Sequence, residues 1–160
     1  MDIRTGLGYD IHRLTEGDGK DFRLAGVVLP KGKVIAHSDG DCLYHSLSNA
    51  LLSALGKEDI GTYFPDGSAK TDNMDSREIL HFALSELRKE NFTISNVVIA
   101  IVLEKVRMKP YKAQIRKKLS EELGIEENRI AIHANTKEGM DAIGNGEAIA
   151  VLSQVCLIKM

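Results

Sequence analysis

The sequence predicts a single α/β domain, of the mixed α+β type, in which helices and strands alternate along the chain. Three stretches repeat apolar residues every three to four positions, as amphipathic helices do, and segments rich in apolar and β-branched residues indicate four or five strands in a mainly mixed sheet. The chain has 160 residues, 43% of them hydrophobic, which is enough for one core. Because no internal repeat, low-complexity segment or linker divides it, we expect residues 1–160 to form one domain.

The first predicted elements are two strands, residues 3–14 and 22–29. A turn rich in Gly and Asp, residues 16–21, separates them, and Pro30 ends the second strand. We therefore expect a hairpin at the start of the chain.

The first helix is predicted from Asp41 to Leu55, where apolar residues recur at the spacing of one helical face and Gly56 supplies a stop. Residues 61–73 follow with Pro, Gly, Ser, Asp and Thr and without periodicity. We predict a long loop there, and loops of that length often bind ligands or close over them.

The second half of the chain carries two more helices. Residues 75–78 resemble a capping box and precede a helix that ends near residue 90. Pro110, at the first helical position, opens a third helix that Gly124 closes. The remaining predicted strands are residues 92–104, 129–136 and 147–159.

The predicted sheet is more apolar than three helices can cover. Residues 97–103 and 148–158 are apolar on both faces in places, and such strands need cover on both sides. Three helices cover one face, so we expect the other face to pack against further copies of the chain. The alternative is a monomer with a compact second layer.

Composition excludes some classes of function. The formal charge is −2, without a basic stripe, and only 5% of residues are aromatic, so nucleic acid is not an expected partner. The N-terminus has no apolar signal segment and residues 97–103 are far too short to span a membrane, so we expect a cytoplasmic protein without membrane contact. Cys42 and Cys156 lack C-x-x-C spacing and are expected to be small buried thiols.

Asp10, His12 and His45 are the candidate metal ligands. Asp10 and His12 lie two apart in a predicted strand, so their side chains project from the same face. His45 lies about 160° around the predicted helix from its apolar stripe and is not expected in the core; a solvated surface histidine is the alternative. Two nitrogens and one carboxylate oxygen suit zinc, and three protein ligands leave a fourth position for substrate or water.

His37 and Ser38 precede the first helix, where backbone N–H groups and the helix dipole favour an anion, so we expect a phosphate there. The alternative is that Ser38, Asp39 or Asp41 only caps the helix. Because Asp39 and Asp41 are poor neighbours for a phosphate, we expect them to cap the helix or to orient a metal-bound imidazole through its second nitrogen.

Two further polar clusters lie in predicted loops. They are Asp59-Ile60-Gly61 followed by Phe64-Pro65-Asp66-Gly67, and Asn135-Thr136-Lys137-Glu138. Carboxylates in such loops bind substrate hydroxyls or a hard cation such as Mg²⁺, and the alternative is that they are solvated turn residues. His81 is expected to be structural or exposed, and His133 is left without a role.

Taken in order, these motifs resemble the 2-C-methyl-D-erythritol 2,4-cyclodiphosphate synthase family over essentially the whole chain. The pattern is D-x-H, HSDGD-x-x-x-H, DIG-x-x-FPD, an acidic residue after Thr136, and G-x-GE at residues 144–147. The resemblance implies a lyase that converts 4-diphosphocytidyl-2-C-methyl-D-erythritol 2-phosphate into the cyclodiphosphate and CMP, in the non-mevalonate route to isoprenoids. It also implies a homotrimer with active sites between neighbouring subunits.

The resemblance further implies roles by position. Asp10, His12 and His45 match ligands of zinc or another divalent cation, and Asp10 and His12 also match substrate-binding positions. Glu138 matches the ligand of an Mg²⁺ or Mn²⁺ ion that bridges the diphosphate. His37 and Thr136 match positions that stabilise the transition state. The positions matched to substrate binding are His37, Ser38, Asp59, Ile60, Gly61, Phe64, Pro65, Asp66, Gly67, Ser68, Thr136, Lys137 and Glu138, with Leu103, Arg107, Met108, Lys109 and Asn135 around the cytidine.

The implied reaction needs no protein nucleophile, because the 2-phosphate of the substrate attacks the β-phosphorus, and the chain has no nucleophile motif such as G-x-S-x-G. Ala142 and Asn145 stand where the family often has Phe and Arg, and Arg107 where Lys is common. The alternative functions are a zinc hydrolase of phosphate esters or amides, with a base such as Asp59, and a metal-stabilised trimeric module that binds nucleotides or isoprenoid diphosphates.

Overall fold

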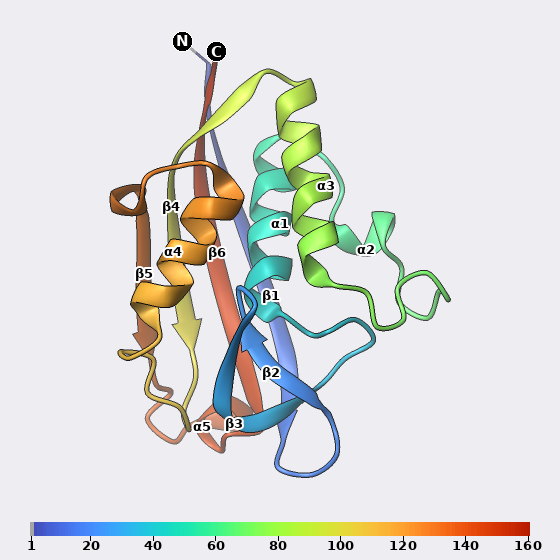
Figure 1. The fold of residues 1–160 in the computed structure, drawn as a ribbon, viewed down its shortest axis with the longest axis vertical. Helices are drawn as coiled ribbons and strands as arrows, with labels where there is room; N and C mark the ends of the chain where they lie inside the picture. Colours follow the sequence, from blue (N-terminus) through green and yellow to red (C-terminus); the bar gives the residue numbers. More distant parts are fainter. Residues whose placement is uncertain (1) are drawn as a thin grey trace.

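The computed structural model describes residues 2–160, which form one six-stranded mixed sheet and five α-helices (Figure 1). The strands lie in the order β2-β3-β1-β6-β4-β5. The elements are β1 (Ile3–Thr15), β2 (Lys20–Leu24), β3 (Val27–Ile35), α1 (Cys42–Ala54), α2 (Ile60–Tyr63), α3 (Ser76–Lys89), β4 (Phe92–Val102), α4 (Lys112–Leu123), a 3-10 turn (Glu127–Arg129), β5 (Ile130–Asn135), α5 (Asp141–Gly144) and β6 (Ala148–Lys159).

The first and last strands form the centre of the sheet. β1 pairs antiparallel with β6 from Ile3 opposite Ile158 to Arg13 opposite Ala148, so the two ends of the chain lie side by side (Figure 1). β6 pairs antiparallel with β4 on its other side, and β4 pairs parallel with β5. α4 is the crossover that a parallel pair requires.

The start of the chain differs from the predicted hairpin. The predicted strand 22–29 is two strands, because Ala25 and Gly26 form a tight turn with φ of 49° and 73°. Two consecutive residues with positive φ match the turn that fits the twist of a hairpin. β3, rather than β2, therefore pairs with β1, and Pro30 lies inside β3 instead of ending a strand.

Helix α1 lies directly on β1. A Cβ atom on Gly8 would stand 1.9 Å from the carbonyl oxygen of Ser46, and one on Gly6 would stand 2.0 Å from that of Ala50. Only glycine allows two backbones to approach so closely. This contact sets the position of α1, and of every side chain on it, relative to the strand.

The three long helices α1, α3 and α4 cover one face of the sheet, as predicted (Figure 1). Each begins or ends as its sequence suggests: Asp75 caps α3 through the N–H of Arg77 and Gly124 ends α4 with φ of 67°. α4 starts at Lys112, so Pro110 lies in the turn before it and not at its first position. The short helix α2 (Ile60–Tyr63) occupies the first residues of the predicted loop 61–73.

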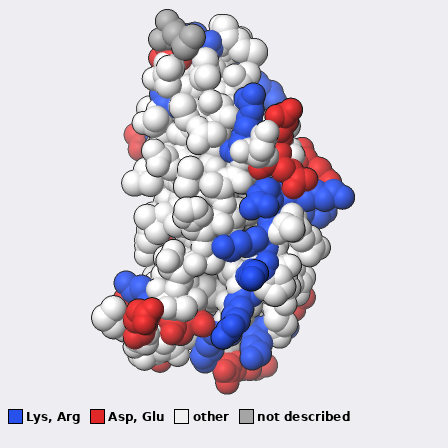
Figure 2. Space-filling model, turned by 90° about the vertical axis from the view of Figure 1, so that its left-hand side faces the viewer, with Lys and Arg blue, Asp and Glu red and all other residues white. Residues whose placement is uncertain are grey.

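The opposite face of the sheet carries exposed apolar side chains. Ile3, Leu7, Tyr9 and Ile11 alternate along β1 and are each about half exposed, while α5 covers only the end of the sheet near Ala148 and Ala150. Seen from the β5 side, a broad strip of the surface is almost free of charge beside a stripe of Lys and Arg (Figure 2). Within residues 2–160, no helix combines the length and the apolar character needed to cross a membrane.

Candidate metal centre

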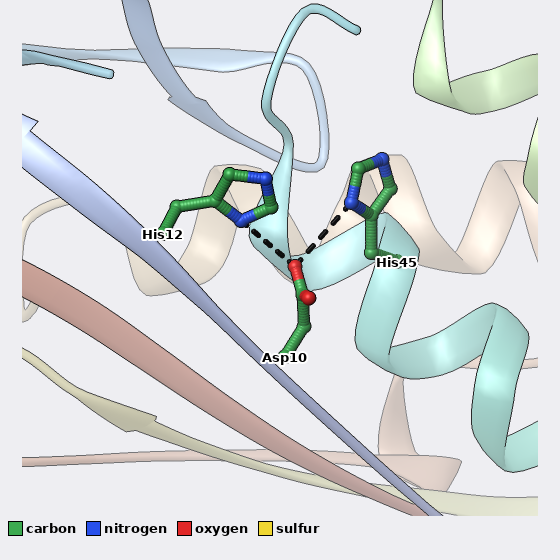
Figure 3. Close-up of side chains that lie close together, drawn as sticks. All are labelled: Asp10, His12 and His45. Atoms are coloured by element: carbon green, nitrogen blue, oxygen red, sulfur yellow. Dashed lines mark ion pairs between the residues drawn. The ribbon is translucent and has the colours of Figure 1, made fainter. Parts of the chain in front are cut away.

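Asp10, His12 and His45 converge on one point, as Figure 3 shows. Asp10 and His12 project from the helix-covered face of β1, and His45 comes from the first turns of α1. The Asp10 Oδ2 atom lies 2.8 Å from Nδ1 of His12 and 3.3 Å from Nδ1 of His45. Because Gly8 lets α1 rest on β1, residues 33 positions apart in sequence meet here.

The atoms of this group lack ordinary partners. Oδ2 of Asp10 and Nδ1 of His12 are buried and make no hydrogen bond within the described residues. Buried polar atoms of this kind need an explanation, and a cation between them supplies one. Two imidazoles and a carboxylate within 4.8 Å of one another fit a divalent cation with an open position. In the part of the chain that the structure describes, no other cluster of His, Cys, Asp or Glu has this arrangement.

The charges in the group stabilise one another. Burial of Asp10 alone would raise its pKa, but the adjacent imidazoles of His12 and His45 lower that pKa to about 2. Burial of His45 alone would lower its pKa, but the contact with Asp10 raises it above the ordinary 6.5. The carboxylate is therefore ionised at neutral pH and available as a ligand.

His45 is not the solvated surface histidine of the alternative interpretation. It is 8% exposed, and its ring faces polar atoms rather than the apolar core. Its second nitrogen, Nε2, lies 2.8 Å from Oγ of Ser76 and 3.3 Å from Oγ of Ser38. Ser76 was not among the residues predicted for the site.

The loop before α1 is held by its own side chains. Asp41 caps the helix by accepting the N–H of Tyr44 and also accepts those of Ala25 and Gly26 in the β2–β3 turn, so its predicted capping role is confirmed. The hydroxyl of Ser38 accepts the N–H of Gly40. The N–H groups of Gly40 and Tyr44 are therefore already paired and are not available to the anion expected from the sequence.

Lys20 adds a positive charge that the sequence did not reveal. Its Nζ donates to the carbonyl oxygens of His37 and Ser38 at 2.7 and 2.6 Å. The residue stands at the start of β2, 17 and 18 positions earlier in the chain, and no motif marks it. His37 is exposed and Ser38 is buried.

A cavity of about 350 Å³ joins the metal ligands to several predicted substrate positions. Its lining includes His37, Ser38, Ile60, Gly61, Phe64 and Asp66 besides Asp10, His12 and His45. Asp59, Pro65, Gly67 and Ser68 lie beside this wall rather than in it: Asp59 caps α2, and the carbonyls of Pro65 and Ser68 accept the hydroxyl of Thr71. The ring of Phe64 packs edge-on against Phe82 of α3, which anchors the segment.

The remaining predicted positions lie elsewhere, at and after the C-terminal ends of β4 and β5. These parallel strands bring Leu103 beside Asn135, whose carbonyl accepts the N–H of Leu103 at 3.0 Å. The hydroxyl of Thr136 donates to the carboxylate of Glu138, and the N–H of Lys137 donates to Glu104. The residues of this second group, named here the β4–β5 group, are Leu103, Arg107, Met108, Lys109, Asn135, Thr136, Lys137 and Glu138. None of them lines the cavity at the metal ligands.

The other residues named from the sequence have simple surroundings. His81 is exposed and pairs with Glu122 at 2.6 Å, and His133 is exposed on β5. Asn145 caps the C-terminal end of α5. Cys42 is buried as expected, whereas Cys156 is only half-buried, and both are free thiols.

Comparisons with known proteins agree over the whole chain. The YgbB family model matches residues 3–158. A 2-C-methyl-D-erythritol 2,4-cyclodiphosphate synthase of Treponema denticola is 41% identical over 158 residues, which cover 98% of this chain and 96% of the relative. The structure of Plasmodium falciparum IspF in a CDP complex matches with a TM-score of 0.87 and 35% identity, covering 98% of this chain and 96% of that one. The bifunctional IspDF of Campylobacter jejuni matches with a TM-score of 0.92 and 36% identity, covering 99% of this chain and 43% of that one.

Proposed function

The chain belongs to the YgbB family, and from this membership we propose that it is a 2-C-methyl-D-erythritol 2,4-cyclodiphosphate synthase. The enzyme is a phosphorus–oxygen lyase of the non-mevalonate isoprenoid route. It converts 4-diphosphocytidyl-2-C-methyl-D-erythritol 2-phosphate into the cyclodiphosphate and releases CMP. The observation that carries this function is the group Asp10, His12 and His45, in which two buried atoms make no hydrogen bond within residues 2–160, beside a cavity that His37 and Ser38 also line.

The reaction exchanges one phosphate bond for another. An oxygen of the 2-phosphate bonds to the β-phosphorus, the bond from that phosphorus to the oxygen of CMP breaks, and CMP carries the electron pair away. No protein nucleophile is required, and the buried thiol of Cys42 does not face the cavity. The protein must therefore act by positioning the two phosphates and by balancing their charge.

The chain supplies both of these effects. A divalent cation held by Asp10, His12 and His45, for which zinc fits the donor set, would offset the repulsion between the phosphates and polarise the phosphorus that is attacked. His37 is exposed at the rim of the cavity, where its ring can donate to a phosphate oxygen. Lys20, through two charged hydrogen bonds, fixes the backbone of the same segment.

The β4–β5 group is assigned to the cytidine diphosphate end of the substrate. Glu138 offers an exposed carboxylate next to the hydroxyl of Thr136, a set of oxygen donors that suits Mg²⁺ or Mn²⁺. Arg107 and Lys109 are exposed after the end of β4 and carry charge that complements a diphosphate. The related Plasmodium falciparum structure is a CDP complex, which supports a cytidine diphosphate ligand.

A homotrimer accounts for the separation of these two groups. The metal ligands and the β4–β5 group lie in different parts of one chain, and a substrate that needs both is accommodated if neighbouring subunits each contribute one. The exposed apolar side chains of β1, among them Tyr9 and Ile11 on either side of Asp10, offer a surface for such packing. Burying them between subunits would cover the face of the sheet that the helices leave open.

The test is product analysis with the cytidylylated substrate. We expect equimolar CMP and a cyclic diphosphate, identified by ³¹P NMR, and loss of both when His45 is replaced by Ala. Release of CMP together with an open diphosphate would instead identify a hydrolase. Tight CMP binding without turnover, in the presence of zinc and magnesium, would identify a binding module.

A further inference from the structure

A chain of hydrogen bonds runs from His45 away from the other metal ligands. Its Nε2, which points away from Asp10 in Figure 3, lies 2.8 Å from Oγ of Ser76 at the start of α3. Oγ of Ser76 donates to one oxygen of Asp39, and the N–H of Ser76 donates to the other at 3.2 Å. Ser76 is fully buried.

The protons available to Ser76 and Asp39 fix the direction of the hydrogen bonds between His45, Ser76 and Asp39. A serine hydroxyl has one proton to donate, and a carboxylate only accepts. Since the hydroxyl of Ser76 donates to Asp39, its remaining role toward His45 is to accept, so Nε2 of His45 must carry a hydrogen. Ser38, 3.3 Å from the same nitrogen, is a longer second acceptor. A neutral imidazole with its hydrogen on Nε2 presents a lone pair on Nδ1, the atom that faces Asp10.

We propose that Asp39 and Ser76 are positioning residues that hold His45 in the tautomer and ring orientation required for Nδ1 to bind the metal. Neither residue lies among the metal ligands, and both act only through His45. The connection spans three elements, since Asp39 precedes α1, His45 lies in α1 and Ser76 begins α3. The packing of α3 against α1 therefore helps to define the metal centre. The proposal rests on the metal site of the proposed function but not on the reaction.

The replacement Asp39→Asn tests the direction of the protons without leaving a cavity. The carboxylate of Asp39 only accepts hydrogen bonds, from the hydroxyl and N–H of Ser76 and from the N–H of Asp41. An amide has one accepting oxygen, so its NH₂ must face one of these groups. If the NH₂ faces Oγ of Ser76, the hydroxyl turns to donate to Nε2 of His45 and moves the imidazole hydrogen to Nδ1, where it competes with the metal. If the NH₂ faces the N–H of Ser76, two donors oppose each other, and the contact between residue 39 and Ser76 is weakened.

The experiment measures zinc affinity of the purified, metal-depleted protein by competition with a chromophoric chelator. We expect Asp39→Asn and Ser76→Ala each to weaken zinc binding by about 10- to 100-fold, the usual effect of removing a partner of a metal-bound histidine. Asp75→Asn is the matched control for Asp39→Asn, because Asn also caps α3. Ser48→Ala is the matched control for Ser76→Ala, since Ser48 is a fully buried serine of α1 that donates only to Tyr44.

Two further measurements separate positioning from folding. The visible spectrum of the cobalt-substituted protein reports the ligand geometry, and we expect it to change in Asp39→Asn and Ser76→Ala but not in the controls. Ser76→Thr, which keeps the hydroxyl, should recover affinity. Circular dichroism of the metal-free variants verifies the fold. If Ser76→Ala does not fold, the zinc affinity of Asp39→Asn, compared with that of Asp75→Asn, tests the proposal.

Zinc affinity in Asp39→Asn equal to that in Asp75→Asn would overturn the proposal. An equal loss of zinc affinity in Asp39→Asn, Ser76→Ala and their two controls would also overturn it. A parent protein that binds no zinc would overturn it together with the metal site. A parent protein that binds zinc, shows the expected order of variants and yet releases no CMP would leave this proposal standing and refute the proposed reaction.

Discussion

Replacing Gly8 by Ala tests whether close contact between α1 and β1 assembles the metal centre. The new Cβ would stand 1.9 Å from the carbonyl oxygen of Ser46 and 2.5 Å from the backbone nitrogen of Ala50, whereas ordinary contacts begin at 3.4 Å. Both obstacles are backbone atoms, so no side chain can turn aside, and the helix must retreat by up to about 1.5 Å. Ser46 follows His45 directly, so the retreat carries His45 away from Asp10.

That displacement is large for a metal ligand, because ligand distances are reproduced to about 0.2 Å in functional sites. We expect zinc affinity to fall at least about tenfold and the free energy of unfolding of the metal-free protein to fall by about 1–3 kcal/mol. Chelator competition measures the first quantity and urea denaturation the second.

Gly17→Ala is the matched control for Gly8→Ala. Its Cβ would meet nothing nearer than 3.5 Å, and Gly17 has no positive φ. We expect both quantities to stay unchanged in this variant. If Gly8→Ala keeps the parent stability and the parent zinc affinity, the idea that this contact positions His45 is wrong.

Three more outcomes are expected. Lys20→Met should lower kcat/KM by about ten- to a hundredfold, because two charged hydrogen bonds to the backbone of residues 37–38 are lost. The control Lys33→Met removes a surface pair with Asp21 and should leave kcat/KM unchanged. Equal effects of the two replacements would contradict the role of Lys20 in fixing that backbone. Removing divalent cations with a chelator should lower the thermal midpoint and abolish CMP release, and zinc together with magnesium should restore both. Full activity in the chelated protein would refute the metal requirement. Folding raises the pKa of His45 above 6.5 and lowers that of Asp10 from 3.8 to about 2, so the metal-free protein should be most stable between pH 3.8 and 6.5 and should lose stability as the pH rises through the raised pKa of His45. The zinc-loaded protein should instead gain stability over the same rise, since zinc needs neutral histidine. The same pH dependence of the thermal midpoint in both forms would contradict this.

Much of the fold follows from patterns within one element. The helix at Cys42–Ala54 and the strands β4, β5 and β6 were predicted within one or two residues, because apolar spacing and glycine stops are local signals. The predicted strand 22–29 failed because Ala25 adopts a positive φ, which its residue type does not suggest. Its conformation is stabilised by Asp41, which accepts its N–H from 16 residues away.

Some residues of the site could likewise be predicted from the pattern of one segment, and others could not. The pair Asp10 and His12 could be predicted because alternation along a strand places both on one face, and His45 because the helical wheel sets it apart from the core. Lys20 and Ser76 could not be predicted, since each reaches its partner across 17 to 31 positions. No motif marks Lys20, and the capping box that contains Ser76 indicates the start of a helix rather than a contact with His45. Such contacts depend on how the elements pack, which the pattern of a single segment does not determine.

The pairing of β1 with β6 also bears on how the chain folds during synthesis. The centre of the sheet consists of the first and the last strand of this domain in sequence order, Ile3–Thr15 and Ala148–Lys159. While β6 is still inside the ribosome, one edge of β1 and one edge of β4 have no partner, and the chain must wait with apolar strands uncovered. Helices α1 and α3 can pair in the meantime, but the sheet closes only after β6 has emerged. For this architecture, the slow and exposed stage of folding falls at the end of the synthesis of this domain.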